Sequence, residues 1–542
     1  MHRFVIFVLF ALLASGDAFA QNADEKFLKK QTLKKVKKNI DLNVKKGYIP
    51  MDIAITGKGR FSVRMKKPFQ DFLWEAEFEL TDDQFETHFK KNHARQLRLV
   101  DHEEYEFKKK KLHACVWHYD KSLAPLSEKD LKNPDKRPPS QPLGMIWQPG
   151  AIIPAVGLQG GPYADFEKRV AEYMTATQMP AISVAFSVKG QPVYQASFGF
   201  ADIQRMKTVT PENTFRTVWM SQLITAIATL QLVDQGKLKL DEPVYPLLGI
   251  KPWKKDKLDS RLDKITIKQL LQMTGGHDSK LTKDPIFNSR HVAKEMKITD
   301  EVSPEQAIQY MMSQPLGYEP GTKRLVSHYG YFLLGQVIEK VSGMSYEDYV
   351  LEHVAKPAKM TSLVMTQVDE SQRPTSSVMH YLRSGRYFQV ITGKDFGKWA
   401  QVDEGVMHYG LLNSSYGWLS TPMDMLALGH ALQSNPSPFL SNEMKEILVS
   451  MPDFEAKLAT TAKPTTWDGM GLRVRALKNG NMDFWMESRG TYSTNSVVCF
   501  ASGDTRCFMM SCFDTADGSN TYTSFAPIAS EGFKVAVRLH RK

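Results

Sequence analysis

Strand-like segments stand at both ends of residues 161–542, and helix-like segments lie between them. Near the start, MPAISVAFSVKGQPVYQASFGFAD predicts a β-hairpin that turns at Lys189-Gly190. Near the end, GLRVRALKNGNMDFWM and NSVVCFASGDTRCFMMSCF are rich in strand-forming residues. First and last strands that enclose helices predict an α/β (α+β) fold, with an antiparallel β-sheet flanked by helices and a helical subdomain.

The segment NTFRTVWMSQLITAIATLQLVDQGKLKLDEPV, residues 213–244, contains the most helix-like run of the chain. Leu223, Ile227, Leu230 and Val233 recur at helical spacing, and Gly236 supplies a helix end. We therefore expect an amphipathic helix.

The first residues, MHRFVIFVLFALLASGDAFA, predict a signal peptide over residues 1–20. A basic residue precedes an apolar run, and small residues precede the expected cleavage after Ala20. The apolar run is shorter than the roughly 20 residues of a membrane span, so we expect secretion and no transmembrane span.

Residues 21–125 contain an internal repeat of about 45 residues. Each copy is expected to form a helix and two strands, with Trp74 and Trp117 closing the second strand as core anchors. A small α+β repeat domain is therefore predicted. It is followed by a Pro-rich linker at 126–160, in which the prolines prevent a continuous helix.

Positive charge is concentrated near the N terminus. The whole chain has a net charge of +11, and residues 21–140 hold 27 Lys and Arg against 19 Asp and Glu, a difference of +8. This favours a polyanion such as an acidic glycan, whereas secretion argues against nucleic acid. The alternative, that the charge serves solubility alone, stays open.

Four cysteines indicate one or two disulfides in a secreted chain, and their spacing predicts no metal site. Cys499 and Cys507 flank a turn and are expected to pair across a hairpin, while Cys115 and Cys512 stay unassigned. Asn413 begins the sequon NSS in a segment predicted to be an exposed loop, so it is a glycosylation candidate.

From residue 161 onwards, several segments occur in the order of one hydrolase family. They are MPAISVAFSVKG, the 213–244 segment, ITIKQLLQMTGG, EPGTKRLVSHYGYFLLGQVIEKVSGMSYEDYV and YGWLSTPMDMLAL. The chain thus resembles the serine β-lactamase-like family, which includes class C β-lactamases and D-Ala-D-Ala carboxypeptidases. The N-terminal repeats resemble the tandem repeat domain of secreted polyglycine hydrolases.

The resemblance implies three catalytic elements: a Ser-x-x-Lys pair at the start of the 213–244 helix, a Tyr-x-Asn element and a His/Lys-x-Gly strand edge. Each has other residues here. The six positions hold Trp219, Gln222, Val326, His328, Glu487 and Arg489. Trp has no nucleophilic atom, and the neutral amide of Gln is no base near pH 7.

The sequence therefore predicts a secreted, catalytically inactive relative of these hydrolases, without a cofactor. Its remodelled cleft is expected to bind a peptide or small molecule or to be filled by packing. The alternative is a hydrolase that uses another nucleophile, Ser221 or Ser327, with His328 as its base.

Overall fold

The computed structural model describes most of the chain, and all statements below concern the described residues: 25–46, 48–56, 60–66, 74–94, 97–107, 110–119, 146–147, 152–203, 207–254, 256, 258–366, 374–380, 388–389, 398–400, 408–458, 465–477, 482–485, 498–502, 505–512 and 526–540. The chain divides into two compact units, one of Met1–Pro125 with Gln204–Met206 and one of Leu126–Ile203 with Lys207–Lys542.

The first unit repeats one arrangement of a strand, a helix and two strands. Its elements are β1 (Glu25–Thr32), α2 (Leu33–Val44), β2 (Ile49–Thr56), β3 (Arg60–Lys66), β4 (Trp74–Leu80), α3 (Asp82–Ala94), β5 (Leu97–Phe107) and β6 (Lys110–Tyr119). The antiparallel sheets have the orders β1-β3-β2 and β4-β6-β5, so the last strand of each copy is central.

The strand before each helix differs from the sequence prediction. Each copy was expected to contain one helix and two strands, but a further strand precedes the helix: β1 ends at Thr32 and pairs with β3. Trp74 begins β4 instead of closing the preceding strand, whereas Trp117 lies in β6 and is buried. Local pattern missed these strands because their partners are distant in sequence.

The two copies share one apolar core. Val36 and Ile40 of α2 are buried in a cluster that also includes side chains of the second copy. Phe61 of β3 packs edge-to-face on Phe78 of β4, with ring centroids 5.3 Å apart. A helix and sheet of this size need such sharing to bury enough apolar surface.

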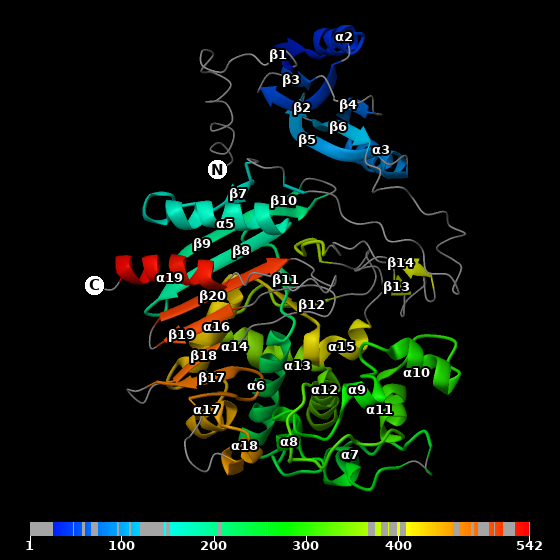
Figure 1. Cartoon of the computed structure of the whole chain (residues 1–542), viewed down its shortest axis with the longest axis vertical. Helices are drawn as coiled ribbons and strands as arrows, with labels where there is room; N and C mark the ends of the chain where they lie inside the picture. The colour runs from blue at the N-terminus through cyan, green and yellow to red at the C-terminus, as the bar shows by residue number, and fades with distance from the viewer. Residues whose placement is uncertain are drawn as a thin grey trace. The chain divides into compact units, whose positions relative to one another are not determined.

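The second unit is built on an antiparallel sheet of order β10-β9-β8-β20-β19, with β7 also paired to β9 (Figure 1). Its strands are β7 (Ala155–Val156), β8 (Ala181–Val188), β9 (Gln191–Asp202), β10 (Lys207–Thr208), β19 (Val498–Ser502) and β20 (Thr505–Cys512). Both ends of the unit thus contribute strands, as the sequence predicts. The β8–β9 hairpin turns at Lys189 and Gly190, both with positive φ as a two-residue hairpin turn requires.

Strand β8 is apolar or small on both sides, with its large side chains on one face of the sheet and its small ones on the other. Ile182, Val184 and Phe186 join the core beneath α5 (Ala164–Thr177) and α19 (Ala526–His540). The alternating small residues Ala181 and Ala185 join the core on the other face, where α16 (Pro422–Gln433) packs (Figure 1). The strand is buried along its whole length because helices cover both sides.

The helical subdomain surrounds α6 (Met220–Asp234) and α12 (His328–Ser342), which contact each other. The remaining helices are α7 (Val244–Leu248), α8 (Ile267–Leu271), α9 (Ser279–Thr282), α10 (Ser289–Met296), α11 (Pro304–Met312), α13 (Tyr346–Val350), α14 (Lys356–Ala358), α15 (Tyr409–Tyr416), α17 (Asn442–Val449) and α18 (Asp453–Leu458).

Single turns and short strands complete the second unit. The turns are η2 (Gly161–Tyr163), η4 (Leu262–Lys264) and η5 (Leu351–Ala355). The strands are β11 (Phe215–Arg216), β12 (Val364–Met365), β13 (Phe388–Gln389), β14 (Trp399–Ala400), β15 (Trp418–Ser420), β16 (Thr466–Asp468), β17 (Arg473–Ala476) and β18 (Met482–Trp485).

Candidate functional site

The chain enters α6 through a strained turn. Strand β11 pairs with β15, and the Thr217 amide donates to the Trp418 carbonyl at 2.8 Å. The next residue, Val218, is buried and has a φ of 49°, which a β-branched residue rarely adopts. Such strain is characteristic of functional turns and is held by the surrounding packing. The turn that leads into α6 is therefore a strained segment held in place by its buried surroundings.

The first helical turn carries Trp219 and Gln222 where the resemblance placed the serine and the lysine. Trp219 is half-buried, and its ring centroid lies 6.1 Å from that of His328. Gln222 is 2% exposed, and its Nε2 has no hydrogen-bond partner among the described residues. The structure thus brings Trp219 and His328 together where α6 and α12 begin, and Gln222 lies in the first turn of α6.

His328 stands in an aromatic environment. Its ring lies edge-on to Phe287 at 5.0 Å and to Tyr416 at 5.8 Å, in addition to Trp219. Its side chain is almost fully buried, and burial lowers its pKa from 6.5 to about 4. Nδ1 is buried and has no partner within the described part of the chain. The imidazole is therefore neutral at physiological pH and is a weak base.

The two alternative nucleophiles have other roles. The Ser221 hydroxyl is fully buried, lies 2.9 Å from the Thr217 hydroxyl and accepts from the Trp418 amide at 3.4 Å. The Ser327 hydroxyl accepts from the Gly330 amide at 3.1 Å and caps α12. Neither hydroxyl hydrogen-bonds to His328 in the described structure, so a serine–histidine pair is not formed.

The other predicted site residues are less informative. Val326 is 38% exposed beside the start of α12, whereas Glu487 and Arg489 lie outside the described residues. Among the described residues, no cluster of three or more His, Cys, Asp or Glu side chains is placed to hold a metal ion.

A buried carboxylate anchors the start of α12, and the sequence offered no motif that would have identified it. Asp284 accepts from the amides of Ile286 at 3.0 Å and Tyr329 at 3.2 Å, and also from the His328 amide. Burial nevertheless raises its pKa from 3.8 to about 6. Asp284 is therefore a positioning residue for His328, since it holds the backbone of the first helical turn.

A second network holds α6 about one turn beyond Gln222. The Thr225 hydroxyl lies 2.7 Å from the Tyr346 hydroxyl, to which the indole nitrogen of Trp418 donates at 2.9 Å. All three side chains are buried. Because removal of any partner leaves a buried polar group unpaired, this network fixes α6 against α13 and β15.

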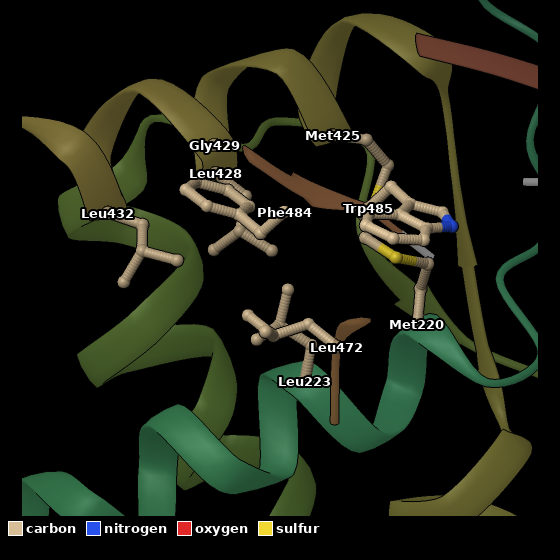
Figure 2. A pocket seen from close by; sticks show the side chains of 9 residues that line it. All are labelled: Met220, Leu223, Met425, Leu428, Gly429, Leu432, Leu472, Phe484 and Trp485. Atoms are coloured by element: carbon tan, nitrogen blue, oxygen red, sulfur yellow. The ribbon is translucent and has the colours of Figure 1, made fainter. Parts of the chain in front are cut away.

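The adjacent face of α6 lines a small apolar pocket (Figure 2). Met220 and Leu223 reach it from α6, and side chains of α16, β18 and the residue before β17 complete it: Met425, Leu428, Gly429, Leu432, Leu472, Phe484 and Trp485. None of these side chains is a nucleophile, an acid or a base, so the pocket by itself indicates apolar packing and no reaction.

The sequon at Asn413 differs from its expected setting. The segment forms α15 instead of an exposed loop, and Asn413 is only partly exposed. Its side-chain oxygen accepts from the Ser414 amide at 2.6 Å, and Ser415 is fully buried. The predicted loop was wrong, because this segment is a helix that packs against α6 and α12. Glycosylation of Asn413 stays a prediction.

The β19–β20 hairpin exists as predicted, but its register sets Cys499 opposite Phe508 and Cys507 opposite Phe500. The two cysteines are therefore not the directly opposite pair that the disulfide prediction assumed, and that disulfide stays a prediction. Cys115 is buried in β6. In the described part of the chain, no helix has both the length and the apolar character that a membrane crossing needs.

Comparison with known proteins gives the same family along most of the second unit. The Beta-lactamase family model matches residues 166–510. Protein flp of Staphylococcus aureus (strain MW2) is 25% identical over 191 residues, which cover 35% of this chain and 36% of that protein. Human serine beta-lactamase-like protein LACTB, mitochondrial, is 24% identical over 306 residues, which cover 47% of this chain and 53% of that protein.

One solved structure has the same fold: the octameric penicillin-binding protein homologue from Pyrococcus abyssi aligns with a TM-score of 0.51 and 20% identity, over 70% of this chain and 77% of its own. The chain spans about a third to a half of the length of the curated relatives described above. Because the family model covers well over half of the 542 residues, the chain belongs to the beta-lactamase family.

Proposed function

We propose that this protein is a secreted, catalytically inactive member of the beta-lactamase family, whose former cleft binds a ligand instead of transferring an acyl group. The observation that carries the proposal is the contact of Trp219 with His328 at the start of α6. An indole occupies the place of the nucleophile, and the facing histidine is neutral and enclosed by aromatic rings.

The loss of chemistry at this place is complete. A serine hydrolase needs a nucleophile and a base that act together, and loss of either costs on the order of a millionfold in rate. Trp219 offers only an N–H donor, and Gln222 is uncharged. The intact turn and helix explain why the fold persists without the reaction.

Two buried polar atoms support a binding role for a peptide or small molecule. His328 Nδ1 and Gln222 Nε2 have no partner among the described residues. Buried polar groups are normally paired, so unpaired ones mark a place where a ligand or water supplies the missing hydrogen bond. The aromatic rings of Trp219, Phe287 and Tyr416 would provide the apolar surface for such a ligand.

The alternative activity, hydrolysis through Ser221 or Ser327, has weaker support. Both hydroxyls serve the local backbone and the neighbouring side chains, as described above. The pKa of His328, about 4, also lies well below the operating pH that suits a general base.

Covalent labelling tests the proposal directly. The full chain is incubated with a fluorophosphonate probe and with a fluorescent penicillin, beside an active class C β-lactamase as positive control, and is then examined by intact mass. We expect no adduct on the wild type. Stoichiometric labelling would overturn the inactive assignment, and its location at Ser221 or Ser327 would establish the alternative.

A restored variant tests how far the loss extends. Trp219→Ser with Gln222→Lys returns the nucleophile pair but leaves Val326 at the tyrosine position and Arg489 at the strand edge. We expect this variant to stay unlabelled too. Labelling of the variant alone would confine the loss of chemistry to α6.

The proposal extends to location and partner. Secretion rests on the signal-like residues 1–20 and is tested by N-terminal sequencing of the exported protein, which should begin at Gln21. An acidic partner for the first unit rests on its excess of positive charge.

A further inference from the structure

The exposed face of α2 has a concentrated positive charge. Lys34, Lys35 and Lys38 lie on its outward side, Lys45 and Lys46 follow directly after its last residue, Val44, and all five are exposed. None of them forms an ion pair with any residue that the structure describes, and Asp41 is the single carboxylate on this helix. We define these five lysines as the α2 lysine face.

Helical spacing arranges the face as a ridge. Lys34, Lys38 and Lys45 are separated by four and seven residues, so they fall within one stripe along the axis, in which Asp41, three residues after Lys38, is the one carboxylate. At 1.5 Å per residue the stripe is roughly 16 Å long. Lys35 and Lys46 flank it. A row of cations of this length matches a linear chain with repeated anionic groups better than it matches a single small anion.

The buried side of α2 argues against a membrane surface as the partner. Helices that lie on lipid bury an apolar face in the membrane. In α2 the apolar residues Val36 and Ile40 are already buried in the core of the unit, and Leu42 is the one large apolar side chain exposed on the helix. The helix therefore has no apolar face left for a bilayer.

Single-stranded nucleic acid is also a poor match. Proteins that bind it without sequence preference combine cations with exposed aromatic rings on which bases stack. None of the large exposed apolar side chains in the described part of this unit is aromatic. Charge complementarity without stacking or insertion is the pattern that a sulfated or carboxylated glycan requires.

We propose that the α2 lysine face is the docking site for a linear acidic glycan. This inference rests on the acidic partner proposed above and adds its chemical class and its place in the fold. It is independent of the cleft, since no residue of α6 or α12 takes part.

The test uses heparin as the probe and the full mature chain. The variant Lys34→Gln/Lys38→Gln/Lys45→Gln removes the stripe. Its matched control, Lys237→Gln/Lys280→Gln/Lys294→Gln, removes three exposed lysines of the second unit, which also have no ion pair among the described residues. Both variants therefore change the net charge by the same amount, and circular dichroism verifies that each is folded.

We expect the wild type to elute from heparin above about 0.15 M salt, where exposed charges are screened beyond roughly 8 Å. The stripe variant should bind heparin about tenfold more weakly, because each of the three lost contacts between an exposed lysine and an anionic group contributes a few tenths of a kcal/mol. The control variant should bind within about twofold of wild type. Asp41→Asn should raise the eluting salt, because it removes the one carboxylate of α2.

The outcomes distinguish the proposed docking site on α2 from the more general proposal that the first unit binds an acidic partner. Equal weakening of both triple variants would show a general charge effect and overturn the docking site, while the acidic partner would stand. Elution of the wild type below 0.15 M would overturn both. Tighter binding to phosphatidylserine vesicles or to duplex DNA than to heparin would overturn the glycan assignment.

Discussion

At the scale of single residues, His328 shows how the surroundings of a side chain set its chemistry. Its amide is held by Asp284 at the start of α12, while its ring is enclosed by Phe287, Tyr416 and Trp219. The same burial that removes its basicity must affect folding, because a proton can bind this ring in the unfolded chain but hardly in the folded one.

His328→Phe therefore tests the buried imidazole through pH. The folded pKa of about 4 lies below the unfolded value of 6.5, so the neutral ring favours folding above pH 6.5, and this contribution is lost as pH falls towards 4. Relative to wild type, the variant should gain roughly 2–3 kcal/mol of unfolding free energy between pH 7.5 and pH 4.5.

Urea unfolding of both proteins at the two pH values measures this difference. Asp284, whose pKa is raised to about 6, contributes with the opposite sign, but it is present in both proteins and cancels in the comparison. Parallel pH dependence in the two proteins would contradict a lowered pKa at His328.

At the scale of elements, the position of α6 is set by close backbone contacts as well as by its apolar face. Gly471, just before β17, has a φ of 76° and lies against the helix. A Cβ atom at this position would stand 2.7 Å from the Leu223 nitrogen and 2.8 Å from the Gln222 carbonyl carbon. These are backbone atoms in the first turns of the helix, so they have little freedom to move.

Gly471→Ala should consequently destabilise the second unit by about 3 kcal/mol or more, because clash adds to backbone strain. Gly236→Ala is the matched control. It has a similar φ of 68° but no atom within 4 Å of the added Cβ, so only about 1 kcal/mol of strain is expected. Similar losses in denaturant midpoint for both variants would show that close approach to α6 is unimportant.

At the scale of the whole molecule, each of the two units has its own hydrophobic core. Val63 is buried in the core shared by the two N-terminal repeats, and Ile227 is buried in the core around α6. Units with separate cores are able to unfold separately. The chain is thus built as two folding units, one basic and one with the family fold.

Calorimetry should accordingly resolve two transitions. Val63→Ala is expected to lower one midpoint by several degrees, because it opens a cavity in the smaller core, and to leave the other within about one degree. Ile227→Ala should do the reverse. A single transition that both substitutions shift equally would contradict separate folding.

Local sequence was sufficient for features that depend on neighbours in the chain. The Lys189-Gly190 turn, the 220–234 helix and the paired strands of β19 and β20 all follow from spacing and turn chemistry. Trp219 and Gln222, at the positions that the resemblance assigns to a serine and a lysine, could also be located from flanking motifs. The packing around these two residues could not be predicted from the sequence.

Tertiary structure decided what surrounds these residues. The ring of His328 meets Phe287 and Tyr416, which are 41 residues before it and 88 after it in the sequence. The burial of Ser221, the helical setting of Asn413 and the pairing of β1 with β3 likewise depend on distant partners. Periodicity and spacing describe one segment at a time, whereas burial, pKa and hydrogen bonding are set by the segments that pack against it.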